Sequence, residues 1–369
     1  MDSGPAPSDR RAGAEAATLA ARFDPRVNNF DAIRLAAAFV VTFSHTWSLA
    51  GRPTDPLSAF LGYSSAALVA VWVFLFISGF LVAASQEQGS TGRFVAARFL
   101  RIYPAFAVVI LLQALVLVPL LYEGPLSEYG RRWLGFHLRN LLLWPQDPYV
   151  PNVFTGLPHN VVNGSLWTIP LEVSFYLCLV VMASLIRMRR ALWLAVFAAT
   201  VCAELMMKQL GMDNEQGPQV FRGIPVYVFV IYFSYFMAGV CAWKYRDRLR
   251  VTAGGAAVAL LLLVAARGTP MAMFLLKFCL GYLVLAVAIA GDWGQRLHRA
   301  AGDLSYGVYL YSFPITNTLL LVADGRFGPF AIFLLSLPPI LLMAWLSWHL
   351  VEAPCQALKR RLPGGAGAR

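Results

Sequence analysis

The chain has 369 residues, of which 59% are hydrophobic and 13% charged, with a formal net charge of +11. Soluble domains average about 45–50% apolar and about 25% charged residues, so this composition excludes an ordinary soluble enzyme and predicts a polytopic membrane protein. The five cysteines are scattered, mostly in apolar runs, at Cys178, Cys202, Cys241, Cys279 and Cys355. Their spacing indicates neither a disulfide framework nor a metal site.

The apolar stretches follow one another with mostly short connections. A bilayer core about 30 Å thick requires roughly 20 apolar residues per helix. Ten stretches approach that length, at residues 30–49, 66–86, 101–122, 166–186, 191–209, 224–243, 252–267, 271–290, 304–322 and 330–351. We therefore predict an all-α, polytopic transmembrane helix bundle of about ten spans over residues 28–355. A disordered cytoplasmic tail is predicted before it at residues 1–27, and a basic cytoplasmic tail after it at 356–369.

Lysine and arginine are distributed unevenly between the connections. If the N-terminus lies inside and the spans alternate, twenty of the thirty fall in inner segments and eight in outer ones, with Arg34 and Lys277 within spans. Retained cytoplasmic loops are enriched in these residues. The bias predicts that both termini are cytoplasmic, and it explains the positive charge without a nucleic-acid partner.

The longest connection, at about residues 123–165, contains the segment RRWLGFHLRNLLLWP. Its aromatic, apolar and basic residues have helical spacing, which is typical of a helix lying along the membrane surface. Two histidines of this connection, His137 and His159, could contact a ligand on the outer side. A lone loop histidine is more often simply exposed, and the sequence does not decide between these readings.

The first predicted span carries Arg34 and His45 in an otherwise largely apolar segment. Eleven residues make almost three helical turns, so both lie on one face, about 16 Å apart along the axis. Ionisable groups within a membrane are costly and indicate a functional site by default. The alternative is that Arg34 extends to the inner surface and His45 hydrogen-bonds to a neighbouring helix.

Six motifs together resemble the acyltransferase-3 family, in the family's order and over about residues 28–360. They are Arg34 with His45 at the family's spacing, VFLFISGFLV (73–82), RFVAARFLRIYPAF (93–106), NGSLWTIPLEVSFYL (163–177), GDLSYGVYLYSFPI (302–315) and HLVEAPCQAL (349–358). The fourth motif is the most specific. Many family members have a histidine in the fifth motif where this chain has Ser312, so a catalytic role is not carried over to that position.

The resemblance implies a multi-pass O-acyltransferase of the bacterial cytoplasmic (inner) membrane. Its expected donor is acetyl-CoA or another short acyl-CoA, and its expected acceptor is a hydroxyl of a cell-surface polysaccharide or glycolipid. Such a transfer needs a base near the acceptor and stabilisation of an oxyanion. No metal is expected, and the partners are membrane lipid and the carbohydrate acceptor.

His45 is the candidate base, because neutral imidazole is the usual proton acceptor near pH 7. Glu172 enters from the outer end of the fourth span and is expected to orient the imidazole and stabilise the imidazolium. The alternative for Glu172 is a carboxyl that is hydrogen-bonded between helices and has no role in the chemistry.

The donor is expected to bind on the inner side. Arg98 and Arg101 are three residues apart and share a helix face, and guanidinium groups suit phosphate. With Arg34 and Tyr103 they are the predicted cofactor-binding residues. Ordinary positive-inside charge is the alternative explanation for the two arginines of the third span.

The acceptor is expected to meet the segment NGSLWT before Pro170. Proline lacks an N–H and suits the first turn of a helix, so this segment is predicted to be irregular backbone that lines a cavity. Asn163, Ser165 and Trp167 are the predicted substrate-binding residues, although Trp167 equally fits an interfacial anchor.

A transporter or flippase is the main alternative function, because buried charge also marks transport paths. Inverted repeats would favour a transporter, and none is visible in the sequence. A transporter would also not require an arginine pair on the inner side. A receptor-like structural protein has no supporting feature.

Overall fold

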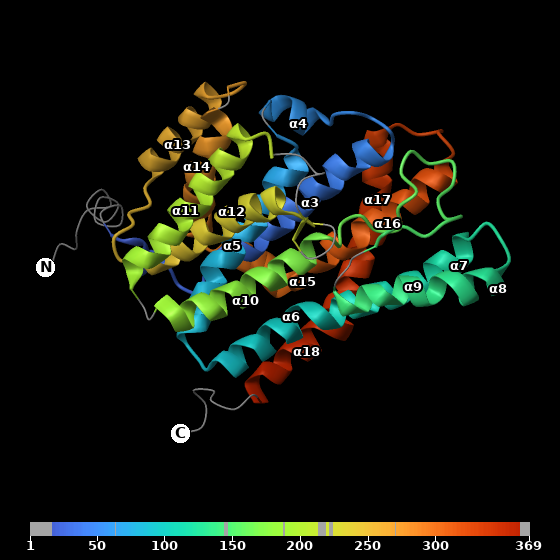
Figure 1. The fold of residues 1–369 in the computed structure, drawn as a ribbon, viewed down its shortest axis with the longest axis horizontal. Helices are drawn as coiled ribbons and strands as arrows, with labels where there is room; N and C mark the ends of the chain where they lie inside the picture. Colours follow the sequence, from blue (N-terminus) through green and yellow to red (C-terminus); the bar gives the residue numbers. More distant parts are fainter. Residues whose placement is uncertain are drawn as a thin grey trace, which may run out of the picture.

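The computed structural model describes residues 17–62, 64–143, 147–186, 189–212, 219–220, 224–269 and 271–361. Over these residues the chain forms a bundle of long helices (Figure 1). The strands in the described part are β1 (Gln219–Val220) and β2 (Ile224–Pro225), which pair antiparallel. The predicted all-α membrane bundle is therefore confirmed.

Eight helices or continuous helical runs of the described chain are long and apolar enough to cross a membrane. They are α3 (Phe30–Leu49), α5 (Ala66–Glu87), α6 (Thr91–Leu112) continued by α7 (Val118–Leu121), α10 (Thr168–Ile186), α11 (Arg190–Gln209), α12 (Val226–Lys244), α14 (Met271–Ala288), and α17 (Pro329–Ser347) continued by α18 (Ala353–Ala357). The two other predicted spans coincide with α13 (Ala253–Ala265) and α16 (Ser305–Ala323). Each predicted stretch thus falls on a helix, and the count of ten spans stays a prediction.

Short helices and turns connect or extend these elements. The short α-helices are α2 (Leu19–Arg22), α4 (Pro56–Leu61), α8 (Leu126–Glu128), α9 (Leu134–Leu138) and α15 (Trp293–Ala301). π-Helical turns are η1 (Gln113–Leu117), η2 (Tyr129–Trp133) and η4 (Trp348–Glu352), and 3₁₀ turns are η3 (Arg139–Leu142) and η5 (Leu358–Arg361).

Ion pairs gather at one end of the bundle. Arg34, near the start of α3, lies 3.5 Å from Asp303, which precedes α16. Lys244 at the end of α12 lies 2.7 Å from Glu87 at the end of α5. These contacts involve the starts of α3 and α16 and the ends of α5 and α12. Helices that alternate in direction along the chain place these four ends on the same side. We call this side, marked by Arg34, Asp303, Glu87 and Lys244, the charged end; that it faces the cytoplasm stays a prediction.

Part of the predicted N-terminal tail is fixed at the charged end. Leu19 of α2 is fully buried, and its N–H donates to the carbonyl of Leu249 at 2.7 Å. The N–H of Ala20 donates to the carbonyl of Arg246 at 2.8 Å. The start of α2 therefore has defined contacts with the turn after α12. Residues 1–16, like residues 362–369 of the predicted C-terminal tail, lie outside the described residues.

The long connection after α7 is helical, as predicted, over η2, α9 and η3. It folds back along the preceding span, because α9 contacts both η1 and α6 (Figure 1). Two tyrosines fix this arrangement: Tyr129 donates to the carbonyl of Ala114 at 2.6 Å, and Tyr103 donates to that of Leu141 at 3.2 Å. The connection thus packs on the bundle and contributes side chains to it. Its sequence pattern, which is typical of a helix on the membrane surface, does not predict this packing.

The closest packing joins α5 to α12. A Cβ atom built on Gly79 would lie 2.0 Å from the carbonyl oxygen of Phe236, and one on Gly239 would lie 2.1 Å from that of Phe76. The two backbones are therefore in direct contact, as small residues permit in membrane helix pairs. Gly79 belongs to the ISGF part of the second motif. The close contact between α5 and α12 explains why a glycine occupies this position.

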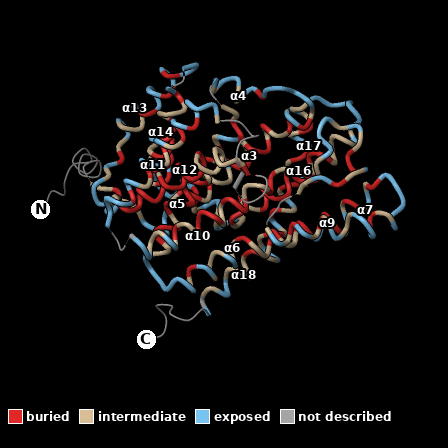
Figure 2. The backbone as a smooth tube through the Cα atoms, in the orientation of Figure 1, coloured by how far each residue is buried: buried red, intermediate tan, exposed pale blue. Residues whose placement is uncertain are grey.

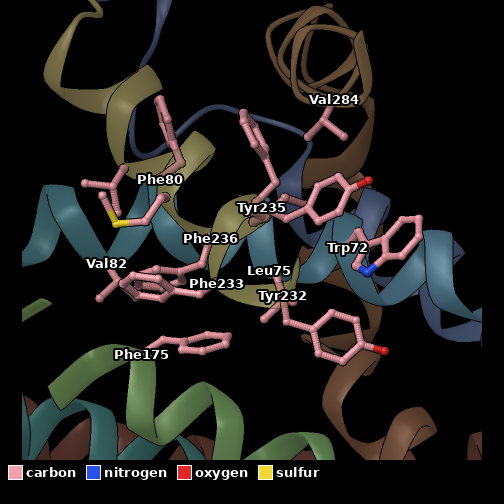
Figure 3. Close-up of a cluster of buried hydrophobic side chains, with 14 of the residues drawn as sticks. Trp72, Leu75, Phe80, Val82, Phe175, Tyr232, Phe233, Tyr235, Phe236 and Val284 are labelled. Carbon is pink, nitrogen blue, oxygen red and sulfur yellow. The ribbon is translucent and has the colours of Figure 1, made fainter. Parts of the chain in front are cut away.

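Aromatic side chains fill the space around this contact (Figure 3). Trp72 of α5 stacks on Tyr235 of α12, with ring centroids 4.6 Å apart and planes 7° apart. Phe175 of α10 lies 5.5 Å from Phe236 of α12. These rings join α5, α10 and α12 into the core against which the remaining helices pack.

The outward faces of the bundle carry exposed leucines, and Figure 2 shows the exposed positions along its outer faces. Leu120 is 77% exposed, Leu185 75% and Leu342 57%. Large apolar side chains at this exposure disfavour a water-facing surface. They suit contact with lipid tails on α7, α10 and α17.

Replacing Gly79 by alanine is expected to destabilise the protein. The added methyl group would overlap the backbone of α12, so we expect the free energy of unfolding to fall by about 2 kcal/mol. Thermal unfolding of the purified protein in detergent measures the change. Gly92→Ala in α6 is the matched control: nothing lies within 4 Å of its added Cβ, so it should be neutral or stabilising by up to about 1 kcal/mol. Equal unfolding temperatures for both variants would contradict the packing described.

Candidate functional site

A cavity of about 110 Å³ lies among α3, α5, α6, α10 and α16, beside the charged end. Three arginines, one carboxylate and several hydroxyls supply its polar lining. These side chains are Arg34, Arg98, Arg101, Glu172, Ser78, Thr168, Tyr176, Ser305, Tyr306 and Tyr309. We call it the arginine cavity. It brings together the three arginines that the sequence predicted to bind the donor, together with Glu172.

Asp303 fixes two of the three arginines. Its Oδ2 lies 3.5 Å from Arg34 and also accepts a hydrogen bond from Arg101, while its Oδ1 accepts from the Ser305 hydroxyl at 2.5 Å. Burial by itself raises the pKa of the Asp303 carboxyl, but the Arg101 and Arg34 guanidiniums outweigh burial and hold that pKa well below its usual range. The carboxylate is therefore ionised at neutral pH and neutralises part of the charge beside the cavity.

Arg98 is placed differently from its two neighbours. It forms no ion pair with any residue of the described chain, and its Nε is buried without a hydrogen-bond partner there. A partly buried cation loses hydration by water, which costs free energy. An anionic ligand beside the guanidinium would offset this cost. Arg98 is the side chain of this cavity best suited to bind one.

Tyr103 does not line the arginine cavity. It stacks on Phe99 with a centroid distance of 4.7 Å and, with Arg98, lines a separate apolar cavity of about 120 Å³. Its hydroxyl is engaged with the backbone of η3. The structure therefore separates Tyr103 from Arg34 and Arg101, with which the sequence grouped it, because it points to a different side of α6.

Glu172 pairs with hydroxyl groups and not with the imidazole. Its Oε1 accepts hydrogen bonds from Ser78 of α5 at 2.7 Å and from Tyr176, one turn further along α10; the two hydroxyls are 2.8 Å apart. The expected contact between Glu172 and His45 is wrong for this structure. The first turn of α10 faces α5 and the arginine cavity, so the carboxylate lies there.

His45 lies in the half of α3 away from the charged end. Its Nδ1 is buried without a hydrogen-bond partner among the described residues, and its ring meets Phe313 of α16 edge-on at 5.6 Å. The uninterrupted helix α3 places Arg34 and His45 on one face, as predicted. Between them on that face, Ala37 and Val41 are buried against Tyr309.

Tyr309 therefore stands between the arginine cavity and His45. It lines the cavity and packs with Val41. Its hydroxyl donates to the carbonyl of Ser165 at 2.7 Å and lies 2.5 Å from the hydroxyl of Thr168. The imidazole does not line the cavity in this structure.

The segment before α10 is irregular backbone, as predicted, and lines a second cavity of about 40 Å³. Its lining consists of Gln113, His137, Asn140, Pro148, Asn163, Gly164, Leu166 and Trp167. We call it the polar cavity. Two of the three predicted substrate-binding residues, Asn163 and Trp167, belong to it.

The same residues also have structural partners. Asn163 donates to the carbonyl of Leu310 at 2.9 Å and accepts from the N–H of Ser165 at 3.2 Å. Trp167 lies 5.5 Å from the ring of Tyr232. The Ser165 hydroxyl is buried, lines neither cavity and has no hydrogen-bond partner in the described chain.

The sequence profile of an acyltransferase domain matches residues 27–349. The chain belongs to the acyltransferase-3 family. The motifs that carry the resemblance supply most of the arginine cavity and part of the wall of the polar cavity.

Two relatives match most of this acyltransferase, and a third matches less than half of it. An O-acetyl transferase of Shigella phage Sf6 is 28% identical over 334 residues, which is 88% of this chain and 95% of the relative. Nodulation protein 10 of Rhizobium leguminosarum bv. viciae is 30% identical over 359 residues, 91% of this chain and 95% of the relative. Acyltransferase MdmB of Streptomyces mycarofaciens is 28% identical over 167 residues, 44% of this chain and 41% of the relative. No solved structure matches the chain.

The predicted family and the predicted class of enzyme, an O-acyltransferase, are thereby confirmed. The multi-pass membrane character is confirmed by the apolar helices. The donor, the acceptor and the roles of the site residues stay predictions.

Sequence reasoning did not single out Asp303 or Gln113, which lie at the two cavities. Asp303 and Tyr309 lie within a recognised motif, but only the packing of α16 shows what they contact. Gln113 is a polar residue in an apolar run, which is a usable signal. His137 was considered only as a histidine of the long connection, and it is 1% exposed.

Replacing Asp303 by asparagine is expected to lower the free energy of unfolding by about 3 kcal/mol at pH 7, because it leaves two arginines without their shared carboxylate. The native pKa of Asp303 is below its unfolded value, so the stabilisation is complete above about pH 4 and is lost as the pH falls further. Unfolding measured in detergent from pH 7 to pH 3 should show the difference between wild type and variant shrinking.

The matched control for that experiment is Asp292→Asn. Asp292 pairs with Arg296 at 3.7 Å, and the two side chains are 51% and 77% exposed, so its loss should change stability by less than about 1 kcal/mol. A difference for Asp303→Asn that is equally small at pH 7 would contradict the structural role of Asp303.

Proposed function

We propose that this acyltransferase moves an acyl group, in the simplest case acetyl, from cytoplasmic acyl-CoA to a hydroxyl of a cell-surface carbohydrate or glycolipid. The charged end would face the cytoplasm and the polar cavity the outer side of the bacterial cytoplasmic membrane. The observation that carries this proposal is the arginine cavity, which opens among membrane helices and contains one guanidinium without an ionic partner in the described chain. The name of the phage relative supports acetyl as the acyl group.

Donor binding would begin with the phosphates of coenzyme A. Asp303 already neutralises much of the charge of Arg34 and Arg101, so Arg98 is the cation available to an added anion. Guanidinium groups bind phosphate through paired hydrogen bonds. A phosphate group beside Arg98 would also remain within reach of the electrostatic attraction of the other two arginines.

Lys359 of η5 adds to this positive region. Burial and the neighbouring charges of Arg98 and Arg101 lower the pKa of the Lys359 amine to about 8. A cation whose neighbours are cations is stabilised when an anion enters, since the opposite charge favours its protonated form. The region is therefore suited to a polyanionic group such as the nucleotide part of coenzyme A.

The acyl-bearing arm would follow the face of α3 that joins Arg34 to His45. That face carries Ala37 and Val41, which are small side chains, and Tyr309 covers it. The thioester reaches His45 only if the Tyr309 ring moves from this position. The distance along the helix, about 16 Å, is comparable to the length of an extended pantetheine arm.

His45 would act as the general base. Its ring would accept the proton of the acceptor hydroxyl while the hydroxyl oxygen attacks the thioester carbonyl carbon. The C–S bond then breaks, the new ester C–O bond remains, and the proton passes to the departing thiolate of coenzyme A. Glu172 would support the reaction indirectly by holding the Ser78 and Tyr176 hydroxyls in the arginine cavity.

Replacing Arg98 by glutamine is expected to raise the KM for acetyl-CoA at least tenfold, about 1.4 kcal/mol of binding free energy, because the unpaired cation is lost. Radiolabelled acetyl-CoA supplied to membranes that contain acceptor measures the rate. Arg190→Gln is the matched control, since Arg190 is 46% exposed and pairs with Asp247. An unchanged KM for Arg98→Gln would contradict the donor site.

Replacing His45 by alanine is expected to lower kcat for acetyl transfer at least a hundredfold, since general-base catalysis contributes about that much or more. The variant should still be extracted as a folded protein, because the side chain has no hydrogen bond to lose at Nδ1. His349→Ala is the control, because His349 is exposed. Transfer by His45→Ala at the wild-type rate would exclude this mechanism.

A further inference from the structure

The polar cavity contains buried polar atoms that the protein leaves unpaired. Gln113 is 2% exposed and His137 is 1% exposed. The two amide atoms of Gln113 and both ring nitrogens of His137 have no hydrogen-bond partner among the described residues. All four atoms belong to side chains that line one cavity.

Such atoms require an explanation, because each buried unpaired donor or acceptor costs about 1–3 kcal/mol. Nothing in the packing of the hydrophobic core requires a glutamine and a histidine at these positions. A ligand that supplies hydrogen bonds would remove the cost.

The chemistry of the lining restricts that ligand. Among the residues that the structure describes, no charged side chain lines the cavity. Burial lowers the pKa of His137 to about 4, although Asp147 opposes the shift, so the imidazole is neutral at pH 7. A neutral imidazole and an amide each offer one kind of atom that donates and one that accepts. A hydroxyl group also both donates and accepts, so it matches them. A phosphate or carboxylate would find no positively charged donor among the described lining residues.

The size of the cavity restricts the ligand further. A single water occupies about 10–15 Å³ on this measure of volume, so about 40 Å³ holds the end of a molecule and not a complete sugar ring. Trp167 provides one aromatic wall, which suits the C–H face of a sugar.

The cavity lies at the depth of His45. Gln113 follows Arg101 by twelve residues on α6 and its continuation, about 18 Å along the axis, and His45 follows Arg34 by eleven residues on α3. Both helices begin on the side of the charged end. The cavity wall also approaches the imidazole: a Cβ on Gly164 would lie 2.7 Å from the Phe313 ring, which is the ring that meets His45.

Gln113 opens the π-helical turn η1, where the widened turn interrupts the regular helix. Such turns are rare and frequently occur at functional sites. Tyr129 holds the turn by donating to the carbonyl of Ala114. The side chain of Gln113 is thus directed to the cavity by a local distortion that the neighbouring connection stabilises.

We propose that the polar cavity is an acceptor subsite in which Gln113 and His137 bind a hydroxyl or hydroxymethyl group of an uncharged sugar. This inference rests on the proposed function and adds the class of the acceptor group and two specificity-determining residues. Asn163 and Trp167 complete the subsite, and Phe313 separates it from His45.

The test uses the purified full-length chain, radiolabelled acetyl-CoA, and membranes of the producing cells that carry the natural glycolipids and polysaccharides. His137→Phe and Gln113→Leu should each lower acetyl incorporation into the glycan fraction at least tenfold at a low membrane concentration, with partial recovery as the membrane concentration rises. The Kd for acetyl-CoA, measured by calorimetry, should stay within twofold of wild type. His137→Gln, which keeps a donor and an acceptor, should recover part of the incorporation.

The matched control is His159→Phe, the same substitution at an exposed histidine of the same connection; it should incorporate label as wild type does. Incorporation by His137→Phe and Gln113→Leu equal to wild type would overturn the subsite. A parallel loss of acetyl-CoA affinity, or a His137→Gln variant no better than His137→Phe, would also overturn it, because these results indicate a structural role. No incorporation by the wild type would instead contradict the proposed function itself.

Discussion

The shared carboxylate of Asp303 is the interaction on which the charged side of this membrane bundle depends. Three guanidinium groups within one cavity repel one another, and the surrounding apolar helices provide little solvent to screen them. Asp303 accepts from Arg101, lies beside Arg34 and is itself held by Ser305. This arrangement joins α3, α6 and α16 at one point and leaves Arg98 without an ionic partner in the described chain, so one cluster contains both paired and unpaired guanidinium groups.

The two cavities differ in the polar groups that they offer. The arginine cavity offers cations, which suit phosphate, and the polar cavity offers neutral groups, which suit hydroxyls. An apolar cluster around Tyr309 and the ring of Phe313 lies between them, with His45 on the far side of Tyr309. A transferase that takes a charged donor from one compartment and a neutral acceptor from the other requires a barrier of this kind, because an open channel would let water reach the thioester.

Much of this arrangement follows from the sequence, and the remainder depends on how helices are rotated about their axes. The common face of Arg34 and His45 follows from helical periodicity alone, which is why that prediction is correct. Glu172 was assigned to the correct helix, yet its partner depends on the contact between α10 and α5, which periodicity does not encode. His137 shows the same limit: its connection has the composition of a surface helix, and only its packing against α6 buries the imidazole.

The helix α16 extends from the arginine cavity to the wall of the polar cavity. Asp303 directly precedes this helix, Tyr309 lies one turn into it and Phe313 one turn further, so one helix contacts the arginine cavity, the apolar cluster and the wall of the polar cavity. Under the proposed function, a donor that shifted α16 would alter the environment of the acceptor, and thermodynamic reciprocity would require the acceptor to alter donor affinity by the same factor. Coupling of this kind would keep the thioester shielded until both substrates are bound.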